Sequence, residues 1–382
     1  MKGQGSDVLL EAKNLRVVRG GSVLVDVPSF VVRKGDVLAV IGPNGAGKTT
    51  LLQALAYLLK PFEGTVFFEG LEVAKGISVL DYRRRLAMAF QEPLLFDTTV
   101  YQNVASGLKI RGMTKRLMRE RVDEALGLFG ISHLADRSAR TLSGGEAQRT
   151  NIARAFATNP ALLFLDEPFN ALDQPSHEAL VKDLRDIVKK TDITVAFVTH
   201  NRLEALQLAT AVAAIQKGRI TQFGSVEDVM NDPKNSFIAS FVGMDCMLPA
   251  RILSCDGNCF VADVKRGTIE GVGDFQIGDR VTLCIRPENV ALSIRTTRNE
   301  TSVRNLFPAR ITSVVPSGPF YKVELDCGFP LASFVTAASV KQLSLREGGE
   351  IFASFKATSV HAVRRGDTEQ PTLAGGTDVT SA

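Results

Sequence analysis

A glycine-rich segment, residues 42–49 (Gly-Pro-Asn-Gly-Ala-Gly-Lys-Thr), stands between a short apolar run and a leucine-rich stretch. The apolar run, Val37 to Ile41, has the β-branched character of a buried strand, and residues 49–59 have the composition of a helix. A strand that passes through glycines into a helix is the setting in which backbone N–H groups wrap a phosphate chain. This order predicts a sheet strand, a phosphate-binding loop and a covering helix.

The residue types in this segment suit a nucleotide's phosphates and a magnesium ion. Glycines let the backbone approach the β- and γ-phosphates, Lys48 supplies positive charge, and the Thr49 hydroxyl can ligate Mg²⁺. Thr50 either adds a contact to the α-phosphate or only begins the helix. We predict phosphate contacts from Gly42, Asn44, Gly45, Gly47, Lys48, Thr49 and Thr50.

Residues 142–149 (Leu-Ser-Gly-Gly-Glu-Ala-Gln-Arg) form a second predicted phosphate site. Ser143, Gly144 and Gly145 precede a helical run, and such a helix end carries bare N–H groups that bind phosphate. Because the chain already has one phosphate cradle, the second site needs another source of nucleotide. We therefore expect it to close over nucleotide held by a second copy of the chain, which predicts an ATP-driven dimer.

From Val8 to about Phe241 apolar strands alternate with helical stretches, which predicts a largely parallel sheet with helices on its faces. A helical insert interrupts this alternation at about residues 91–158. Its predicted helices are Tyr101 to Leu108, Lys115 to Phe129 and Glu146 to Ala157.

Polar side chains follow two of the predicted strands. Asp166 and Glu167 follow the apolar run 161–165, and His200 follows the run 193–198. In open parallel sheets ligands gather at these carboxyl ends. We expect Asp166 to hold Mg²⁺ through water, Glu167 to accept a proton from an attacking water, and His200 to reach the γ-phosphate. Alone, the carboxylates could form a solvated acidic turn, and the histidine could be structural.

Gln91 begins the helical insert and has an oxygen and an amide that can touch Mg²⁺ and the attacking water. Apolar residues 94–96 follow it, and a loop would expose them unless a partner covered them. This segment therefore predicts a contact with another protein.

After Phe241 the chain changes to short β segments that contain an internal repeat. Residues 248–252 (Leu-Pro-Ala-Arg-Ile) resemble residues 307–311 (Phe-Pro-Ala-Arg-Ile), and residues 278–290 resemble residues 348–360. The repeat predicts two small β-barrels, although short β segments can also match by chance. Residues 366–382 have little to bury and are predicted to be disordered.

Composition limits the classes of protein to which the chain can belong. Apolar residues make up 45% and charged residues 23% of 382, as in soluble globular proteins. A net charge of +4 does not suggest a nucleic-acid partner. The polar N-terminus and the strand-sized apolar runs suggest no signal peptide and no membrane span, so we expect a cytoplasmic protein unless it docks elsewhere. The five cysteines are predicted to be reduced and to pack as small apolar residues.

These motifs, together with Ala171-Leu172-Asp173, occur in the order found in the ATP-binding subunits of ABC transporters, which residues 8–241 resemble. The resemblance implies that two copies sandwich two ATP molecules, with Ser143, Gly144 and Gly145 of one copy facing the γ-phosphate bound by the other. It places Asp173 at the dimer seam, and Gln91 against membrane subunits. The family has an aromatic residue that stacks on adenine where this chain has Arg19, whose guanidinium can also stack on a base.

Residues 301–365 resemble TOBE or Mop-type domains, which bind molybdate and tungstate; Val303 replaces the usual alanine. An oxyanion needs hydroxyl groups, backbone donors and cations. The side chains that could supply them, or could instead be ordinary surface residues, are Ser302, Arg304, Thr336, Lys356 and Ser359.

The resulting prediction is an α/β P-loop ABC cassette at residues 6–241, an all-β region of two OB-like or TOBE-like barrels at residues 245–365, and a tail. The resemblance implies an ATPase at the cytoplasmic face of the membrane that imports molybdate or tungstate. It also implies two permease subunits and an extracytoplasmic solute-binding protein. Three alternatives remain: an importer of sulfate, polyamine, sugar or ferric iron; a soluble ABC ATPase of DNA repair or translation; and an oxyanion-binding protein with a silent ATPase domain.

Overall fold

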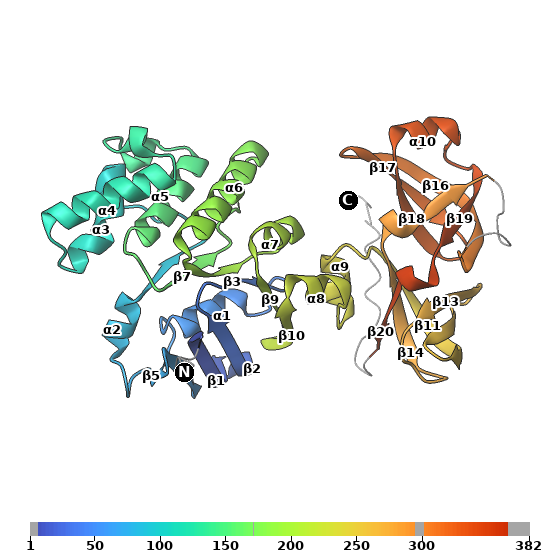
Figure 1. The fold of residues 1–382 in the computed structure, drawn as a ribbon, viewed down its shortest axis with the longest axis horizontal. Helices are drawn as coiled ribbons and strands as arrows, with labels where there is room; N and C mark the ends of the chain where they lie inside the picture. The colour runs from blue at the N-terminus through green and yellow to red at the C-terminus, as the bar shows by residue number, and fades with distance from the viewer. Residues whose placement is uncertain (1–6, 171, 295–301, 366–382) are drawn as a thin grey trace, which may run out of the picture. The chain divides into compact units, whose positions relative to one another are not determined.

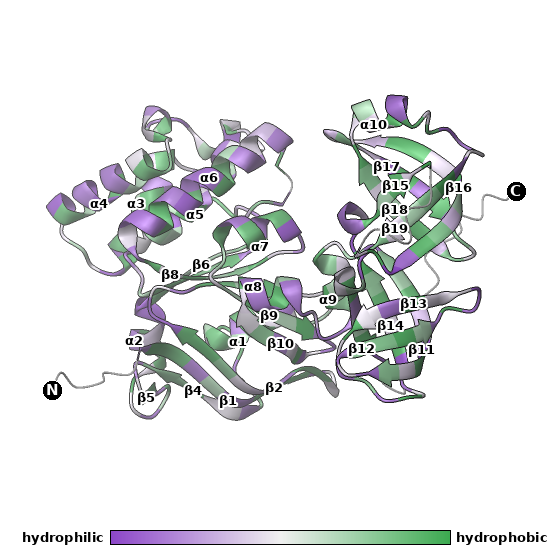
Figure 2. Ribbon diagram, turned by 45° about the vertical axis from the view of Figure 1, so that its right-hand side comes forward, coloured by the Kyte–Doolittle hydropathy of each residue, from purple (hydrophilic) through white to green (hydrophobic). Residues whose placement is uncertain are grey.

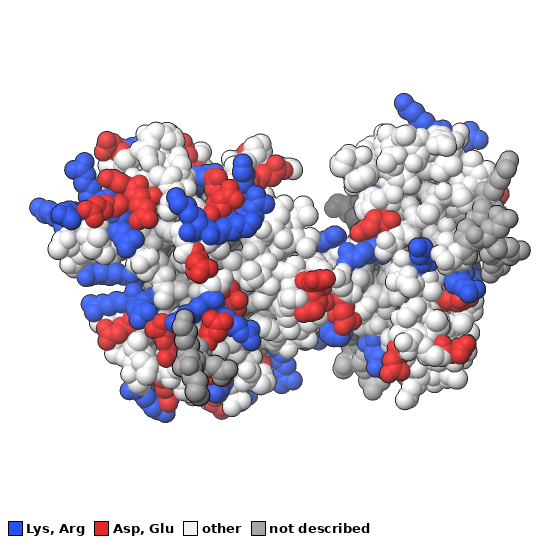
Figure 3. Space-filling model, viewed as in Figure 1, with Lys and Arg blue, Asp and Glu red and all other residues white. Residues whose placement is uncertain are grey.

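The computed structural model describes residues 7–170, 172–294 and 302–365. It divides into two compact units, residues 1–231 and 232–382, whose elements are labelled in Figure 1. The predicted disordered tail lies outside the described residues, as does Ala171. None of the helices in the described ranges has the length and apolar content needed to cross a bilayer. Figure 3 shows Lys and Arg interspersed with Asp and Glu on the visible face of both units.

A six-stranded sheet with the order β10, β9, β3, β8, β7, β6 forms the centre of the first unit. Its parallel strands are β3 (Val37–Ile41), β6 (Leu86–Ala89), β7 (Leu162–Asp166), β8 (Thr194–Val198) and β9 (Ala211–Gln216), and β10 (Arg219–Ser225) pairs antiparallel with β9. Every residue of β3, β7 and β8 is buried, as expected for strands covered on both faces. The predicted parallel sheet is confirmed.

The prediction of one largely parallel sheet was incomplete, because the first unit also has a four-stranded antiparallel sheet. Its strands are, in order, β2 (Ser22–Arg33), β1 (Val8–Arg19), β4 (Glu63–Phe68) and β5 (Leu71–Glu72). Buried and exposed residues alternate along much of β1 and β2, and Gly20 and Gly21 turn between them with φ of +56° and +78°. Alternation with a glycine turn is typical of an antiparallel hairpin.

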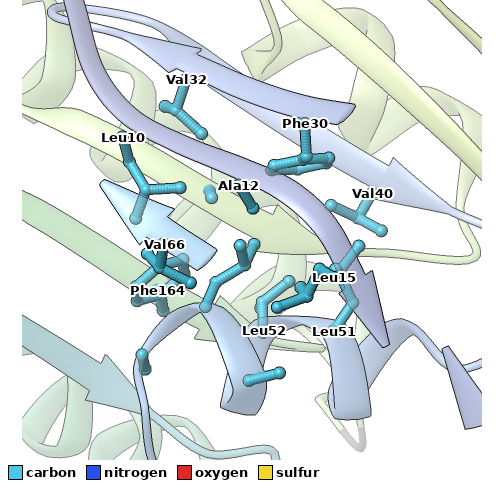
Figure 4. Close-up of a cluster of buried hydrophobic side chains, with 14 of the residues drawn as sticks. Leu10, Ala12, Leu15, Phe30, Val32, Val40, Leu51, Leu52, Val66 and Phe164 are labelled. Atoms are coloured by element: carbon cyan, nitrogen blue, oxygen red, sulfur yellow. The ribbon is translucent and has the colours of Figure 1, made fainter. Parts of the chain in front are cut away.

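Helix α1 (Lys48–Leu55) contributes to a hydrophobic core shared with both sheets. Figure 4 shows Leu51 and Leu52 of this helix beside Leu15 of β1 and Val40 of β3. The other helices of the unit are α2 (Val79–Arg84), α3 (Val100–Ile110), α4 (Lys115–Leu128), α5 (Gly144–Phe156), α6 (Gln174–Thr191), α7 (Arg202–Leu208) and α8 (Val226–Asn231), with short 3₁₀ turns η1 (Ser132–Leu134) and η2 (Ala139–Thr141).

The predicted helical insert is present, since α3, α4 and α5 pack against one another within residues 91–158. Figure 2 shows that α4 is largely hydrophilic, and Val122, Ala125 and Leu126 are its buried residues, as expected for a surface helix. The predicted helix limits differ from the observed ones by at most two residues.

The second unit begins with α9 (Ser236–Phe241) and contains two five-stranded sheets. One has the order β13 (Thr268–Val272), β12 (Cys259–Asp263), β11 (Cys246–Asp256), β14 (Arg280–Ile285), β20 (Val360–Arg364). The other has the order β15 (Ala291–Ser293), β19 (Glu350–Phe355), β16 (Asn305–Ser317), β17 (Phe320–Asp326), β18 (Pro330–Val335). Helix α10 (Ala337–Gln342) and the 3₁₀ turns η3 (Pro287–Asn289) and η4 (Ala357–Ser359) complete the unit.

The two sequence repeats have the same strand register and exchange their last strands. Leu248 of β11 faces Leu283 of β14, and the equivalent Phe307 of β16 faces Ala353 of β19. The last strand of the first repeat, β15, pairs with β19 of the second, and the last strand of the second, β20, pairs with β14 of the first. Each sheet therefore needs both repeats.

Two buried side chains tie the repeats together at equivalent positions. Asn305 accepts a hydrogen bond at Oδ1 from the Glu270 N–H (2.8 Å) and donates from Nδ2 to the Glu270 carbonyl (2.9 Å). Cys246, the equivalent residue in the first repeat, accepts from the Ala332 N–H at 3.2 Å. Asn305 thus supplies the partners of a backbone N–H and a carbonyl on β13, the edge strand of its sheet.

The five cysteines were predicted to be reduced and to pack as small apolar residues, and the packing part of this prediction was wrong for two of them. Cys246, Cys284 and Cys327 are buried, and burial raises the pKa of their thiols, so they remain protonated at neutral pH. Cys255 and Cys259 are exposed, because they flank the turn of the β11–β12 hairpin rather than its packed face. All five thiols are free.

Replacing Asn305 with Ala should loosen β13, because the N–H and carbonyl of Glu270 lose their partners at a cost of about 2 kcal/mol. Hydrogen exchange of the full chain should show faster exchange for residues 268–272 and unchanged exchange for β7. Ser313→Ala, which removes an exposed hydroxyl bonded to Glu324, is the matched control. Unchanged exchange of β13 in Asn305→Ala would contradict this role.

Candidate functional site

The loop between β3 and α1 places Lys48 at the centre of the candidate site. The Lys48 side chain is buried, and its Nζ donates to the carbonyl oxygens of Gly42 at 2.9 Å and Pro43 at 3.1 Å. Burial lowers the pKa of Lys48, while the nearby carboxylates of Glu167 and Asp166 act to raise it. The ammonium group therefore lies inside the loop and close to two acidic side chains.

Two glycines allow the narrow path of this loop. A Cβ on Gly42 would lie 2.3 Å from the Ile215 carbonyl oxygen, and a Cβ on Gly47 would lie 2.7 Å from the Leu24 carbonyl oxygen. Gly47 also has φ of +100°, which disfavours any other residue. Asn44 and Gly45 form the exposed tip of the loop, and Thr50 is partly buried in α1.

Asp166 and Thr49 bring two oxygen ligands together beside Lys48. Asp166, the last residue of β7, accepts a hydrogen bond at Oδ1 from the Thr49 hydroxyl at 2.9 Å. Burial raises the pKa of Asp166, the Thr49 hydrogen bond opposes this, and the charge of Glu167 adds to the effect of burial. A carboxylate next to a hydroxyl is a set of hard oxygen donors that suits Mg²⁺, so these residues fit the ion.

Glu167 follows Asp166 in a backbone conformation that non-glycine residues rarely adopt, with φ of +44°. Its Oε2 accepts from Nδ2 of Asn170 at 3.2 Å and lies 3.5 Å from Nδ1 of His200. Because β7 and β8 are parallel and Asp166 faces Val198, the residues that follow the two strands meet at one edge of the sheet. The structure thus brings Lys48, Thr49, Asp166, Glu167 and His200 into one cluster.

Gln91 lies at the same edge of the sheet, since it follows β6, which pairs in parallel with β7. The loop after it is held by the helical insert. Asn103 of α3, fully buried, accepts from the Phe96 N–H at 2.8 Å and donates to the Phe96 carbonyl at 3.0 Å. Arg154 of α5 donates to the Leu94 carbonyl at 2.7 Å. Leu94 and Phe96 themselves are 66% and 56% exposed.

The second predicted phosphate site is the N-terminus of α5, where Ser143 is the N-cap. The Ser143 hydroxyl accepts from the Glu146 N–H at 3.3 Å, and Glu146 Oε2 accepts from the Ser143 N–H at 2.8 Å. This bond from the Ser143 backbone lowers the pKa of Glu146. The expectation of bare N–H groups is therefore corrected: the capping box engages two of them, and Gly144 and Gly145 form the first turn.

Asp173 is the N-cap of α6, where its Oδ2 accepts from the Ser176 N–H at 3.5 Å. Hydrogen bonding with the Ser176 side chain, and to a lesser extent with the Ser176 N–H, lowers the pKa of the Asp173 carboxyl. Arg19 is exposed at the end of β1, next to the glycine turn, and the following strand reaches the phosphate loop where the Leu24 carbonyl approaches Gly47. The adenine-stacking role of Arg19 stays a prediction.

Beside Glu167 and His200 lies a group of three side chains that was not predicted from the sequence: Thr199 and Glu204, which are buried, and His177, which is partly buried. His177 Nε2 lies 2.6 Å from Glu204 Oε1, and the Thr199 hydroxyl donates to Glu204 Oε2. One signal was available, because His177 follows Asp173, the N-cap of α6, by four residues. In a helix this spacing places residues one turn apart.

The candidate oxyanion residues occupy two local settings in the second unit. Arg304 and Lys356 lie directly beyond the facing pair Asn305 and Phe355, so they extend from the same end of β16 and β19. Ser302 precedes Arg304 and Ser359 ends η4. Thr336 is instead the N-cap of α10, where its hydroxyl accepts from the Ser339 N–H at 3.2 Å.

Two protein-family models match the chain: the ABC transporter model over residues 25–170 and the TOBE domain model over residues 301–362. The chain is 35% identical to the molybdate/tungstate import ATP-binding protein of Pyrococcus horikoshii, over 87% of this chain and 94% of that protein. It is 34% identical to the spermidine/putrescine import ATP-binding protein of Clostridium acetobutylicum, over 75% and 80%. It is 33% identical to the sulfate/thiosulfate import ATP-binding protein of Mycolicibacterium paratuberculosis, over 96% and 94%.

Solved structures resemble the first unit. The cbiO1 protein of Clostridium perfringens, part of the ABC transporter complex cbiONQ, matches with a TM-score of 0.54 and 30% identity, over 59% of this chain and 91% of that one. A dimeric ATP-binding cassette in a post-hydrolysis state, bound to ADP and Pi, matches with a TM-score of 0.51 and 26% identity, over 57% and 99%.

Replacing Asp166 with Asn should stabilise the chain at pH 7, because burial raises the pKa of Asp166 and the ionised carboxyl therefore costs more in the folded than in the unfolded state. The gain should vanish below the ordinary pKa of 3.8, where the carboxyl is protonated in both states. Thermal unfolding of both proteins between pH 3 and pH 8 measures the difference. A variant less stable than the parent at pH 7 would contradict the assigned cost.

Proposed function

The chain belongs to the ATP-binding subunits of ABC transporters, and from this premise we propose that it is the ATPase of a molybdate or tungstate importer. The observation that carries the ATPase part is the convergence of Lys48, Asp166, Glu167 and His200 at one edge of the parallel sheet. The loop 42–47 binds the phosphates, and Glu167 accepts the proton of the attacking water. His200, next to Glu167, contacts the γ-phosphate.

Magnesium would be held by Thr49, Asp166 and Gln91, and when bound it neutralises charge on the β- and γ-phosphates. The bond between Thr49 and Asp166 keeps two of these groups in place before nucleotide arrives. The Glu167 carboxylate lies between Nδ2 of Asn170, at 3.2 Å, and Nδ1 of His200, at 3.5 Å. Together these residues prepare the site for an in-line attack by water.

A second copy of the chain completes each site in this proposal. Ser143, Gly144 and Gly145 of one copy face the γ-phosphate held by the other, and the capping box orders that helix end. Asp173 lies at the seam between the copies. The dimeric cassette with ADP and Pi, which this chain resembles, supports such a pair.

The partners that we propose are two membrane-spanning permease subunits and an extracytoplasmic solute-binding protein, with the chain peripheral at the cytoplasmic face of the membrane. The loop around Leu94 and Phe96 is the proposed permease contact, because exposed apolar side chains on a loop tied by Asn103 and Arg154 form a firm apolar surface. The mixed surface charge gives no reason to propose nucleic acid as a partner.

Two features support molybdate or tungstate as the solute. The relative from Pyrococcus horikoshii is named for these anions, and the TOBE match covers the candidate oxyanion residues. Arg304 and Lys356 extend from one end of β16 and β19 and could compensate a dianion's charge, with hydroxyls from Ser302 and Ser359 nearby in sequence. We propose that anion binding here reports the solute level and restrains the ATPase.

A second candidate is the same ATPase serving another solute, with a second unit that only dimerises. The observation that favours it is the similar identity, 33–34%, to relatives named for sulfate/thiosulfate and for spermidine/putrescine import.

Glu167→Gln should abolish turnover but retain ATP, because the amide cannot accept the proton from water. We expect kcat to fall by about 100-fold or more and an ATP-dependent dimer to persist in size-exclusion chromatography with light scattering. Glu227→Gln, an exposed change on α8, is the control. Hydrolysis at the parent's rate in Glu167→Gln would overturn the role of the base.

Tungstate should bind the full chain in preference to sulfate, because the proposed groups lie in the segment that matches the TOBE domain model and resembles domains that bind molybdate and tungstate. Titration calorimetry should give heat with tungstate for the parent and for Lys341→Gln, an exposed change on α10, and a loss of affinity of about tenfold for Arg304→Gln. Absence of heat with either anion would remove the sensor and favour the second candidate.

A further inference from the structure

A cavity of about 190 Å³ lies directly beside the proposed catalytic pair Glu167 and His200. Its wall also includes Phe169, His177, Thr199 and Glu204. They come from three segments: the one after β7, the first turns of α6, and the turn from β8 into α7. The cavity thus lies where these three segments meet.

The His200 side chain is 60% exposed, so its own packing does not determine where it lies. Its position depends on the backbone turn from β8 to α7. In that turn the Thr199 hydroxyl accepts from the Asn201 N–H at 2.9 Å and donates to Glu204 Oε2. Glu204, in the first turn of α7, is therefore the anchor of the turn that carries His200.

Glu204 is buried, and a buried carboxylate needs donors. Thr199 supplies one, and His177 lies 2.6 Å away at its other oxygen. The His177 ring also makes an edge-to-face contact with the Phe169 ring, with ring centroids 5.7 Å apart. Phe169 is buried two residues after Glu167. His177 thus contacts both Phe169, in the segment that carries Glu167, and Glu204, the anchor of the turn that carries His200.

These contacts close a ring around the cavity. It runs from Glu167 to His200 (3.5 Å), along the chain to Thr199, through Glu204 to His177, and through Phe169 back to Glu167. The ring connects Glu167 with His200 in two ways, by their direct contact and by the path through Phe169, His177 and Glu204. If the bond between His177 and Glu204 is lost, only the direct contact remains.

The same helix turn connects the ring to the proposed dimer seam. The His177 N–H donates to the carbonyl of Asp173, the N-cap of α6, at 2.9 Å. The neighbouring Ser176 lies so near the first turn of α5 that a Cβ on Gly145 would be 3.3 Å from its hydroxyl. A displacement of Asp173, or of Gly145 against Ser176, would therefore be transmitted to His177, which lies in the first turns of α6.

We infer that His177 is a positioning residue for ATP hydrolysis, which sets the place of His200 against Glu167 through Glu204 and Thr199. This inference rests on the proposed function and adds to it a residue that touches neither nucleotide nor metal. Its effect must appear in kcat, because the phosphate loop is built from other residues and the KM for ATP should not change. Displacement of a reacting group by about 1 Å can cost on the order of 100-fold in rate.

The test uses steady-state ATP hydrolysis by the full chain. His177→Leu removes the donor but keeps a side chain against Phe169, and kcat should fall about 10- to 100-fold with KM within about twofold. His177→Gln places an amide N–H near the position of Nε2 and should keep kcat within about threefold of the parent. Glu178→Gln, the next residue on α6, exposed and bonded to Gln174, is the matched control.

Thr199→Val removes the other donor to Glu204 with little change in shape, and it tests the same ring should His177→Leu not fold. We expect a similar fall in kcat, and we expect the double variant to be no slower than the slower single variant, since both changes break one unit.

Parent-like kcat in His177→Leu, equal losses in His177→Leu and His177→Gln, or parent-like kcat in Thr199→Val would overturn the inference. His200→Ala separates it from the proposed function: if that variant hydrolyses ATP like the parent, the proposed role of His200 is wrong. If His200→Ala is inactive and the His177 variants are not impaired, only the positioning role is wrong.

Discussion

The parallel pairing of β3, β8 and β7 is the constraint on which the site depends. These strands are buried along their whole length. Because they are parallel, the segments that follow them all leave the core at the same edge of the sheet. That edge receives Lys48 from the loop after β3, Glu167 from the turn after β7 and His200 from the turn after β8. The hydrophobic core below supplies the stability, and the edge holds a buried lysine, two adjacent carboxylates and a strained backbone.

In the second unit, each sequence repeat completes the sheet of the other. Because each repeat gives its last strand to the other's sheet, neither repeat has a complete hydrogen-bonded sheet alone. The repeats are also unequal in charge. By the alignment of residues 248–252 with 307–311, Gly243 and Asp245 stand where the second repeat has Ser302 and Arg304. The Ser302 hydroxyl and the Arg304 guanidinium of the proposed oxyanion site therefore have no equivalent in the first repeat, whereas Arg286 stands where the second repeat has Lys356.

Much of the fold followed from local pattern. The glycine loop, the apolar runs of β7 and β8 and the three insert helices were predicted to within two residues, because burial on both faces and helix capping leave clear sequence signals. The antiparallel sheet was not predicted, although buried and exposed residues alternate along much of β1 and β2, because the prediction rested on the alternation of strands with helices from Val8 to about Phe241. Cys255 and Cys259 were misjudged because exposure at a hairpin turn depends on the pairing of β11 and β12.

The sequence by itself determined the family, the order of the motifs and the residues of the phosphate loop, because glycine, lysine and threonine at fixed spacing have few other uses. Only the tertiary structure decided which side chains meet. The contact of Thr49 with Asp166, the clamp of Asn305 on Glu270 and the exchange of β15 and β20 join residues that are far apart in the chain. The group of His177, Glu204 and Thr199 became visible for the same reason: its members acquire a common role only when packing brings α6 and α7 together.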